Sequence, residues 1–293
     1  MLTERAPAKI NLSLHVGLVK PNGRHDLNSL VTFADPTASD IVEAEPASHF
    51  SLSVEGPYAL EAGPARDNLV LQAARALKEA LDGDVPPLAF RLKKNLPCAA
   101  GIGGGSADAG AALRLIAKAH GGDRVQEVIR EIAPTLGGDV LACVYSLPGL
   151  MTGEGEHYEP VLAIPALPAI LVNPGVACPT GPVFAKFDED ATVMLSHPLP
   201  TASRSGSDRF IEYLEFGTDN TLQAPAQILV PEISGVLGQM AQLQGARLTR
   251  MSGSGATCFT LFDSLDQAAL AASDLRKGHP DWWVVATMLG GGL

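Results

Sequence analysis

The sequence lacks the features on which several large classes of protein depend. It has only four cysteines and no C-x-x-C pair, which argues against a zinc ribbon and a small disulfide scaffold; the four are Cys98, Cys143, Cys178 and Cys258. The most apolar stretch, Val161–Val172, is short and contains two prolines, and no long apolar segment opens the chain. We therefore expect no membrane span, no signal peptide and a cytoplasmic location.

The sequence is also poor in positive charge. Lys and Arg number 21 against 32 for Asp and Glu, which gives a net charge of -11. A negative chain repels phosphate backbones and anionic lipid, so we expect no nucleic-acid or membrane partner and only a local phosphate site. The seven histidines show no metal-binding spacing such as H-E-x-x-H, so we expect no protein metal site.

What remains is a globular chain of mixed secondary structure. The 293 residues correspond to about two domains. Alternating apolar residues from Ile10 to Leu18 predict a strand with Lys9 at its start. Further strands are expected at 40–45, 50–54, 89–93 and 282–287, and on both sides of a turn within 247–262. Helices are expected from a cap at Asp67 to a stop near Gly83, after the glycine-rich loop, from 125 to near Pro134, and around 208–216, 231–244 and 266–277. A polar loop is expected at Ser196–Ser207.

The segment Pro97–Asp108 carries the strongest chemical signal. Its glycines immediately precede a predicted helix, where backbone N–H groups and the helix dipole favour an anion, so a phosphate could bind there; an ordinary flexible turn is the alternative. The loop is no Walker A motif because no Gly-Lys-Ser closes it. Ser106 occupies the place of the third glycine of a dinucleotide fingerprint, and a helix beginning at Asp123 follows where that fold needs a strand.

Lys9 and Asp139 are candidates for phosphoryl-transfer chemistry. Such a reaction needs a group that orients or deprotonates the attacking hydroxyl and a cation that stabilises negative charge. The plain alternatives are a solvated lysine and a helix cap, and spacing alone does not show that the two residues meet. The segment Ser252–Ala256, between two predicted strands, is either a tight connection or a loop that faces a ligand. Neither glycine loop matches G-x-S-x-G, which argues against a serine hydrolase.

Three segments together resemble the GHMP small-molecule kinases: Pro7–Leu12, Pro97–Ala109 and Met251–Thr257. Within that superfamily the chain resembles the 4-diphosphocytidyl-2-C-methyl-D-erythritol kinase family. The segments that carry this closer resemblance are Ala6–Leu12, Gly23–Leu27, Gly103–Ser106, Gly138–Val140 and Asn173–Val176. Their order and spacing cover nearly the whole chain, so the match is far more specific than any one glycine loop.

The resemblance implies a fold and a reaction. The fold is α+β with a ribosomal-protein-S5-like N-terminal domain, residues 1–152, and a ferredoxin-like C-terminal domain, residues 153–293, with the active site between them. The reaction is transfer of phosphate from ATP, with Mg²⁺, to the 2-hydroxyl of the cytidyl substrate, a step of the non-mevalonate route to isoprenoid precursors. The expected partners are this small molecule and ATP, and the expected state is a monomer or weak homodimer.

The resemblance also implies roles for single residues. Asp139 would accept the hydroxyl proton beside Lys9. The residues expected at ATP are Asn68, Lys93 or Lys94, Pro97, Gly101, Ile102, Gly103, Gly104, Gly105 and Ser106. Those expected at the acceptor substrate are Asn11, Arg24, His25, Asp139, Thr180 and Phe184. His25 would recognise cytosine and Phe184 would stack on it.

Two positions depart from the family pattern. Arg24 stands where Tyr is common, so its guanidinium plane would have to replace an aromatic wall, and Ala107 stands where a second serine often follows Ser106. Three alternatives stay open: another GHMP kinase acting on an alcohol such as homoserine or mevalonate, a noncatalytic nucleotide-binding relative, and, at the level of fold, a Rossmann oxidoreductase.

Overall fold

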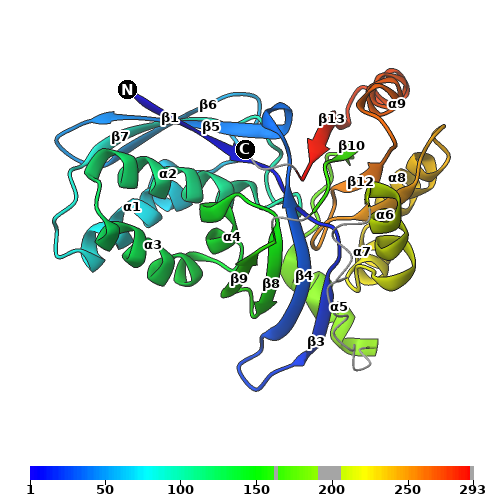
Figure 1. Cartoon of the computed structure of the whole chain (residues 1–293), viewed down its shortest axis with the longest axis horizontal. Helices are drawn as coiled ribbons and strands as arrows, with labels where there is room; N and C mark the ends of the chain where they lie inside the picture. The colour runs from blue at the N-terminus through cyan, green and yellow to red at the C-terminus, as the bar shows by residue number, and fades with distance from the viewer. Residues whose placement is uncertain (162–163, 191–205, 291–293) are drawn as a thin grey trace.

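A computed structural model of the chain describes residues 1–161, 164–190 and 206–290 (Figure 1). The N-terminal half contains two sheets and a layer of helices, and the C-terminal half contains a third sheet with its own helices. None of the described helices combines the length and hydropathy needed to cross a membrane. All four cysteines are free, as the sequence predicts.

The first sheet has the strand order β1-β5-β7-β6. Its strands are β1 (Leu2–Pro7), β5 (Ser39–Pro46), β7 (Leu88–Lys93) and β6 (Ser51–Glu55). Neighbours pair antiparallel except β6 and β7, which are parallel and joined through α1 (Leu69–Ala80). This helix lies with α2 (Gly104–His120) and α3 (Asp123–Leu136) on one side of the sheet (Figure 1). The glycine loop therefore leads from a sheet strand into a buried helix.

The second sheet brings the start of the chain beside its middle. It contains β2 (Lys9–Asn11), β4 (His25–Phe33), β8 (Gly149–Gly153) and β9 (His157–Pro160), with β3 (His15–Val19) paired to β4. The predicted strand over 10–18 is thus broken in two, because the amides of Leu12 and Ser13 both turn to the carbonyl of Leu30. The N-terminal sheet continues through β9, beyond the expected boundary at residue 152.

The C-terminal sheet has the antiparallel order β11-β12-β10-β13. Its strands are β10 (Leu167–Asn173), β11 (Leu248–Met251), β12 (Cys258–Leu261) and β13 (Trp283–Leu289). Helices lie between β10 and β11 and, as α9 (Leu265–Gly278), between β12 and β13. This β-α-β-β-α-β order is that of a ferredoxin-like domain, so the expected α+β architecture is confirmed. The first connection contains α5 (Thr180–Asp190), α6 (Gly206–Gly217), α7 (Gln223–Leu229) and α8 (Glu232–Ala241).

The two halves share their hydrophobic cores. Ile10 and Leu12 are fully buried in a cluster that includes Leu167 and Phe259 from the C-terminal sheet. Full burial of one such side chain stabilises the fold by about 2 kcal/mol. Because side chains alternate along a strand, the burial of Ile10 turns its neighbours in β2, Lys9 and Asn11, toward the other face.

Several predicted helix ends differ from the structure. The cap of α1 is Asn68, one residue after the predicted Asp67, and its Oδ1 accepts a hydrogen bond from the amide of Val70 at 3.0 Å. Helix α3 runs past Pro134 because a proline in the last turn removes only one late N–H donor. The β8–β9 hairpin, α5 and α7 were not predicted. The expected polar loop 196–207 lies almost wholly outside the described residues.

Candidate active site

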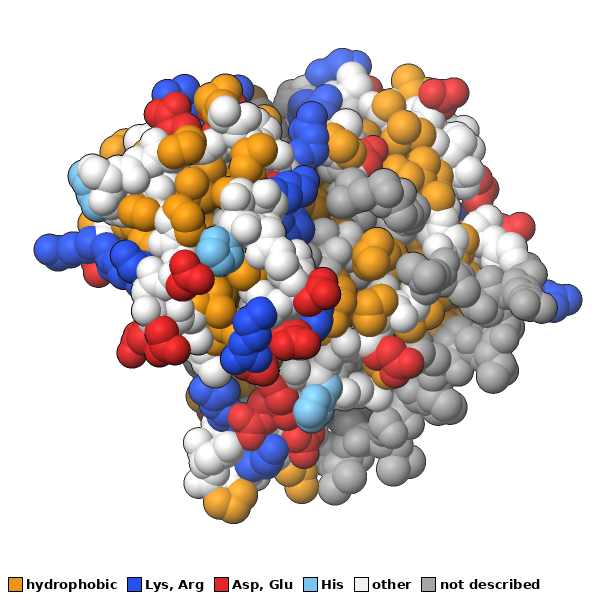
Figure 2. Space-filling model, turned by 60° about the vertical axis from the view of Figure 1, so that its left-hand side comes forward, with side chains coloured by type: hydrophobic (Ala, Val, Ile, Leu, Met, Phe, Trp, Pro, Cys, Tyr) orange, Lys and Arg blue, Asp and Glu red, His pale blue; other side chains and the backbone are white. Residues whose placement is uncertain are grey.

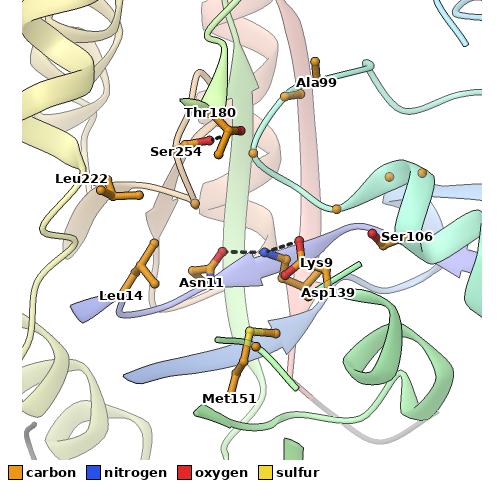
Figure 3. Close-up of a pocket in the computed structure, with 18 of the residues that line it drawn as sticks. Lys9, Asn11, Leu14, Ala99, Ser106, Asp139, Met151, Thr180, Leu222 and Ser254 are labelled. Carbon is orange, nitrogen blue, oxygen red and sulfur yellow. Dashed lines mark hydrogen bonds and ion pairs between the residues drawn. The ribbon is translucent and has the colours of Figure 1, made fainter. Parts of the chain in front are cut away.

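A cleft of about 430 Å³ lies where the two halves meet (Figure 3). Its walls come from β2, the glycine-rich loop, the start of α2, the turn before α4 (Val140–Tyr145) and the start of α5. Among the described residues that line it, Lys9 and Asp139 are the charged ones. The uncharged residues that line the cleft include Asn11, Leu27, Leu69, Gly101, Gly103, Gly104, Gly105, Ser106, Thr180, Phe184 and Ser254.

Lys9 and Asp139 form an ion pair inside this cleft (Figure 3). The Nζ of Lys9 lies 3.1 Å from Oδ2 of Asp139 and donates a hydrogen bond to Oδ1 of Asn11 at 2.7 Å. The lysine is buried, whereas about a third of the Asp139 side chain reaches solvent. Asp139 is at the N-cap position of α4, but its side chain makes no hydrogen bond to that helix. Its carboxylate is therefore not engaged in capping. The structure therefore brings Lys9 and Asp139 together, which their spacing in the sequence could not show.

Gly103 lies directly over this ion pair. Its φ is +62°, a conformation that favours glycine, and a Cβ there would meet Cε of Lys9 at 3.2 Å and Oδ2 of Asp139 at 3.4 Å. The amide of Lys9 also donates to the carbonyl of Ile102 at 2.9 Å. The glycine loop and the candidate catalytic pair are thus one continuous structure.

The start of α2 offers backbone donors to the cleft. The first intrahelical bond runs from the amide of Ala107 to the carbonyl of Gly103, which leaves the amides of Gly104, Gly105 and Ser106 without helical acceptors. No side chain caps this end. Free amides at the positive end of a 17-residue helix form an anion site. Gly104 and Gly105 belong to the helix itself, whereas the sequence placed them in the preceding loop.

The second glycine loop packs against the first, backbone to backbone. The hydroxyl of Ser252 donates to the carbonyl of Gly101 at 3.1 Å and accepts from the amide of Asn11 at 3.1 Å. Ser254 lines the cleft and shares a 2.9 Å hydrogen bond with Thr180 (Figure 3). The connection Ser252–Ala256 thus faces the cleft through Gly253 and Ser254. Ser252 thus joins β2 to the first glycine loop, a role that its sequence position did not indicate.

Three expected ATP-side residues need separate comment. Lys94 does not line the cleft: its side chain is 2% exposed, and its Nζ lies 2.5 Å from Asp40 and 2.6 Å from Asp108. The expected contact of Lys94 with adenosine therefore does not fit this geometry, because the ammonium is already enclosed by carboxylates. Lys93 is exposed on β7, and Asn68 adjoins the cleft residue Leu69 while capping α1.

Lys94 lies between Asp40 and Asp108 in a buried cluster of ionisable side chains. Oδ1 of Asp40 accepts hydrogen bonds from the amides of Asn95 and Leu96. Burial raises the pKa of Asp108, although the ammonium of Lys94 acts in the opposite direction. Burial also disfavours the Lys94 ammonium, but the two carboxylates outweigh this and raise its pKa.

The far end of the cleft carries the expected base-binding pair. The rings of His25 and Phe184 have centroids 5.0 Å apart at an angle of 42°. Nε2 of His25 lies 2.7 Å from Oδ1 of Asp188, a partner that sequence analysis missed because nothing in the sequence links α5 to β4. The structure therefore places His25 and Phe184 side by side.

Arg24 lies away from this pair. Its side chain is 70% exposed, and its guanidinium lies 3.5 Å from Glu154 in the β8–β9 turn. Because adjacent residues of an extended chain point to opposite faces, the burial of His25 directs Arg24 outward. The idea that Arg24 replaces an aromatic wall therefore finds no support in this geometry.

The charge distribution agrees with a local phosphate site. On the face shown in Figure 2, acidic side chains lie among basic ones rather than apart from them. Within the described ranges, no cluster of three or more His, Cys, Asp or Glu side chains could hold a metal ion. The groups in the cleft that could contact an anion are the first α2 amides and the ammonium of Lys9.

Comparisons with known proteins agree with this geometry. The chain matches the family model of the GHMP kinases N terminal domain over residues 68–146 and that of the GHMP kinases C terminal domain over residues 203–281. It is 50% identical to a 4-diphosphocytidyl-2-C-methyl-D-erythritol kinase of Hyphomonas neptunium, with 97% of this chain and 95% of that protein covered. It is 44% identical to the enzyme of the same name from Methylorubrum extorquens, with 99% of both chains covered.

Solved structures give the same assignment. A crystal structure of 4-(cytidine 5'-diphospho)-2C-methyl-D-erythritol kinase matches with a TM-score of 0.78 and 32% identity, covering 99% of this chain and 100% of that one. A homoserine kinase from Cytophaga hutchinsonii shares the fold at a TM-score of 0.66 and 18% identity. The match covers 99% of this chain and 96% of that one. The chain therefore belongs to the GHMP kinases and, within them, to the 4-diphosphocytidyl-2-C-methyl-D-erythritol kinase family.

Proposed function

We propose that this chain transfers the γ-phosphoryl group of MgATP to the 2-hydroxyl of 4-diphosphocytidyl-2-C-methyl-D-erythritol, with the 2-phosphate and ADP as products. The bond between the β–γ bridging oxygen and the γ-phosphorus breaks, and the substrate oxygen forms the new bond to that phosphorus. The hydroxyl proton leaves to a carboxylate of the protein. The observation that carries the proposal is the Lys9–Asp139 ion pair directly beneath Gly103.

The donor occupies the α2 side of the cleft. The amides of Gly104, Gly105 and Ser106 receive the phosphates, and Leu69 and Asn68 lie where the nucleoside extends from them. Mg²⁺ bound with ATP would need only one or two protein oxygens, a demand that the Ser106 hydroxyl fits. That hydroxyl would hold the ion, which would neutralise phosphate charge.

Asp139 and Lys9 act on the attacking oxygen. The Asp139 carboxylate orients the hydroxyl and accepts its proton, and its partial exposure leaves room for that contact. The transition state is loose, so positioning and charge stabilisation matter more than early deprotonation. Lys9, held by Asn11 and buried, keeps a positive charge beside the transferred group with little reorganisation.

The acceptor extends from Asp139 toward α5. Asn11 and Thr180 lie on this path and offer polar contacts to the methylerythritol and diphosphate portions. Phe184 stacks on cytosine, a contact worth about 1 to 3 kcal/mol, and His25 reads its edge. This division places the donor at the first glycine loop and the acceptor between β4 and α5.

The test is ADP release from MgATP with the cytidyl substrate, with homoserine, mevalonate and no acceptor as controls. Turnover on the cytidyl substrate alone is the expected result. Asp139→Asn should bind ATP as the parent does and lose most turnover, because it alters the base without touching the glycine loop. Turnover on a different acceptor, or unchanged turnover in Asp139→Asn, would reject this function or this role respectively.

A further inference from the structure

Asp188 holds the ring of His25 in a single orientation. Oδ1 of Asp188 lies 2.7 Å from Nε2 of His25, a short hydrogen bond for this pair of atoms. Asp188 follows Phe184 by four residues in α5, so both side chains lie on the same face of that helix. His25 is 7% exposed and also packs edge-on against Phe187, with ring centroids 6.1 Å apart. The imidazole is therefore fixed by contacts from one helix.

This hydrogen bond determines which ring nitrogen carries the proton. An ionised carboxylate only accepts hydrogen bonds, so Nε2 must donate. The neutral imidazole then has no hydrogen on Nδ1, which becomes an acceptor. Within the described part of the chain, Asp188 is the residue that hydrogen-bonds the imidazole, and no described group donates to Nδ1.

The ring of His25 lies next to residues that line the cleft. Leu27, two residues after His25 on β4, lines the cleft, and alternate residues of a strand share a face. Phe184, whose ring centre is 5.0 Å from that of His25, lines it as well. An acceptor nitrogen next to an aromatic face suits a flat base with an amino group on its edge.

We propose, on the basis of the proposed function, that Asp188 is the positioning residue that makes this site select cytosine over uracil. Cytosine presents its exocyclic amino group, a donor, where uracil presents a carbonyl oxygen, an acceptor. Nδ1 of a His25 fixed by Asp188 accepts from the amino group and repels the carbonyl. Asp188 itself does not touch the substrate; it sets the tautomer of the residue that does.

The informative variant is Asp188→Asn. An amide can donate through its nitrogen as well as accept through its oxygen, so His25 is free to protonate Nδ1 and to accept at Nε2. Binding of CDP and of UDP to the folded protein is measured by calorimetry, together with kcat and KM for the cytidyl substrate and its uridyl analogue. The parent should prefer the cytosine ligand by about 100-fold, and the variant by less than about tenfold. KM for ATP should stay unchanged.

Two control variants separate tautomer control from a structural effect. Asp188→Glu keeps the carboxylate and should restore most of the selectivity. Glu189→Gln removes the same charge one residue away, where the side chain pairs with Lys186 instead, and should leave selectivity intact. Equal losses for CDP and UDP in Asp188→Asn, with their ratio unchanged, would overturn the proposal.

The two kinds of measurement also keep this inference apart from the proposed function. CDP selectivity that depends on Asp188 in a protein that does not phosphorylate the cytidyl substrate would reject the reaction and support the base selection. Turnover on the cytidyl substrate with equal affinity for CDP and UDP would support the reaction and overturn the base selection.

Discussion

The ammonium of Lys94 lies 2.6 Å from the carboxylate of Asp108, and neither side chain reaches solvent. Lys94 directly follows strand β7, whereas Asp108 is in the second turn of α2, so this ion pair ties the helix to the end of the strand. A Cβ on Gly104 would lie 3.1 Å from Nζ of Lys94, which places the ammonium directly behind the first amides of α2. The cluster therefore supports the start of α2 without lining the cleft.

Lys94→Met should strongly destabilise the fold. It leaves the carboxylates of Asp40 and Asp108 buried without their cation, and breaking such a cluster costs about 3 to 5 kcal/mol. The loss should be smaller at low pH, where the carboxylates can become protonated. Urea unfolding at pH 5 and pH 8 measures both effects. Lys93→Met, at the exposed last residue of β7, is the matched control, and equal losses in the two variants would contradict the assigned role.

Asp108→Asn should change how stability depends on pH. Burial raises the pKa of Asp108 from 3.8 to about 8, with the Lys94 ammonium opposing the shift. Because the folded pKa is above the unfolded one, the contribution of this group is fully present below about pH 4 and is lost as pH rises through about pH 8. An amide mimics the protonated acid, so the variant should gain stability relative to the parent between these values. Denaturant unfolding across this window tests it, and parallel curves for the two proteins would refute it.

Gly101→Ala should separate the two glycine loops. The residue has a φ of +74°, and its Cβ would lie 2.5 Å from the carbonyl oxygen of Ser252 and 2.7 Å from that of Gly255. Left-handed backbone alone costs about 1 to 2 kcal/mol for alanine, and the two backbone contacts add to this. Gly105→Ala is the control, because its Cβ would meet only Leu69 at 3.6 Å in a helical turn. Thermal unfolding without ligand should show a lowered Tm for the first variant only.

Local sequence patterns predicted most elements of the fold. The exceptions arise at individual hydrogen bonds. Alternation found Lys9 at the start of a strand, but it could not show that the amides of Leu12 and Ser13 both turn to Leu30 and interrupt that strand. A cap signal at Asp67 was one residue early, because the side chain of Asn68 makes the capping bond. The strand break depends on tertiary hydrogen bonds to Leu30 and the cap on a local hydrogen bond from Val70, and periodicity encodes neither.

Sequence patterns indicated single residues of the site but not which of them lie in contact. The residues of the glycine loop by themselves predicted an anion site. Lys9 and Asp139 meet only because β2 and the start of α4 lie under Gly103. Lys93 or Lys94 was expected at adenosine from the family resemblance, but Lys94 is buried and pairs with carboxylates instead. Asp188 carried no signal, since its role depends on the packing of α5 against β4.

Arg24→Ala should leave recognition of the substrate base almost unchanged. The side chain is 70% exposed and pairs with Glu154, and exposed ion pairs contribute about 0 to 1 kcal/mol. KM for the cytidyl substrate should therefore stay within about threefold of the parent value, because a loss of 0.6 kcal/mol corresponds to about that factor. Phe184→Ala is the comparison and should raise this KM by at least tenfold through lost stacking. A similar rise in both variants would show that Arg24 does form a wall of the base site.

Lys9→Ala should slow phosphoryl transfer much more than it weakens nucleotide binding. The buried ammonium, 3.1 Å from Asp139, stabilises charge that develops in the transition state, and loss of such a group costs about 3 kcal/mol, or about 150-fold in kcat. KM for ATP should change little, because the α2 amides hold the phosphates. The double variant Lys9→Ala, Asp139→Asn should lose less than the product of the single losses if the pair acts as a unit. Single-turnover rates at saturating ATP provide the measurement, and a Lys9→Ala rate within a factor of two of the parent would rule out the electrostatic role.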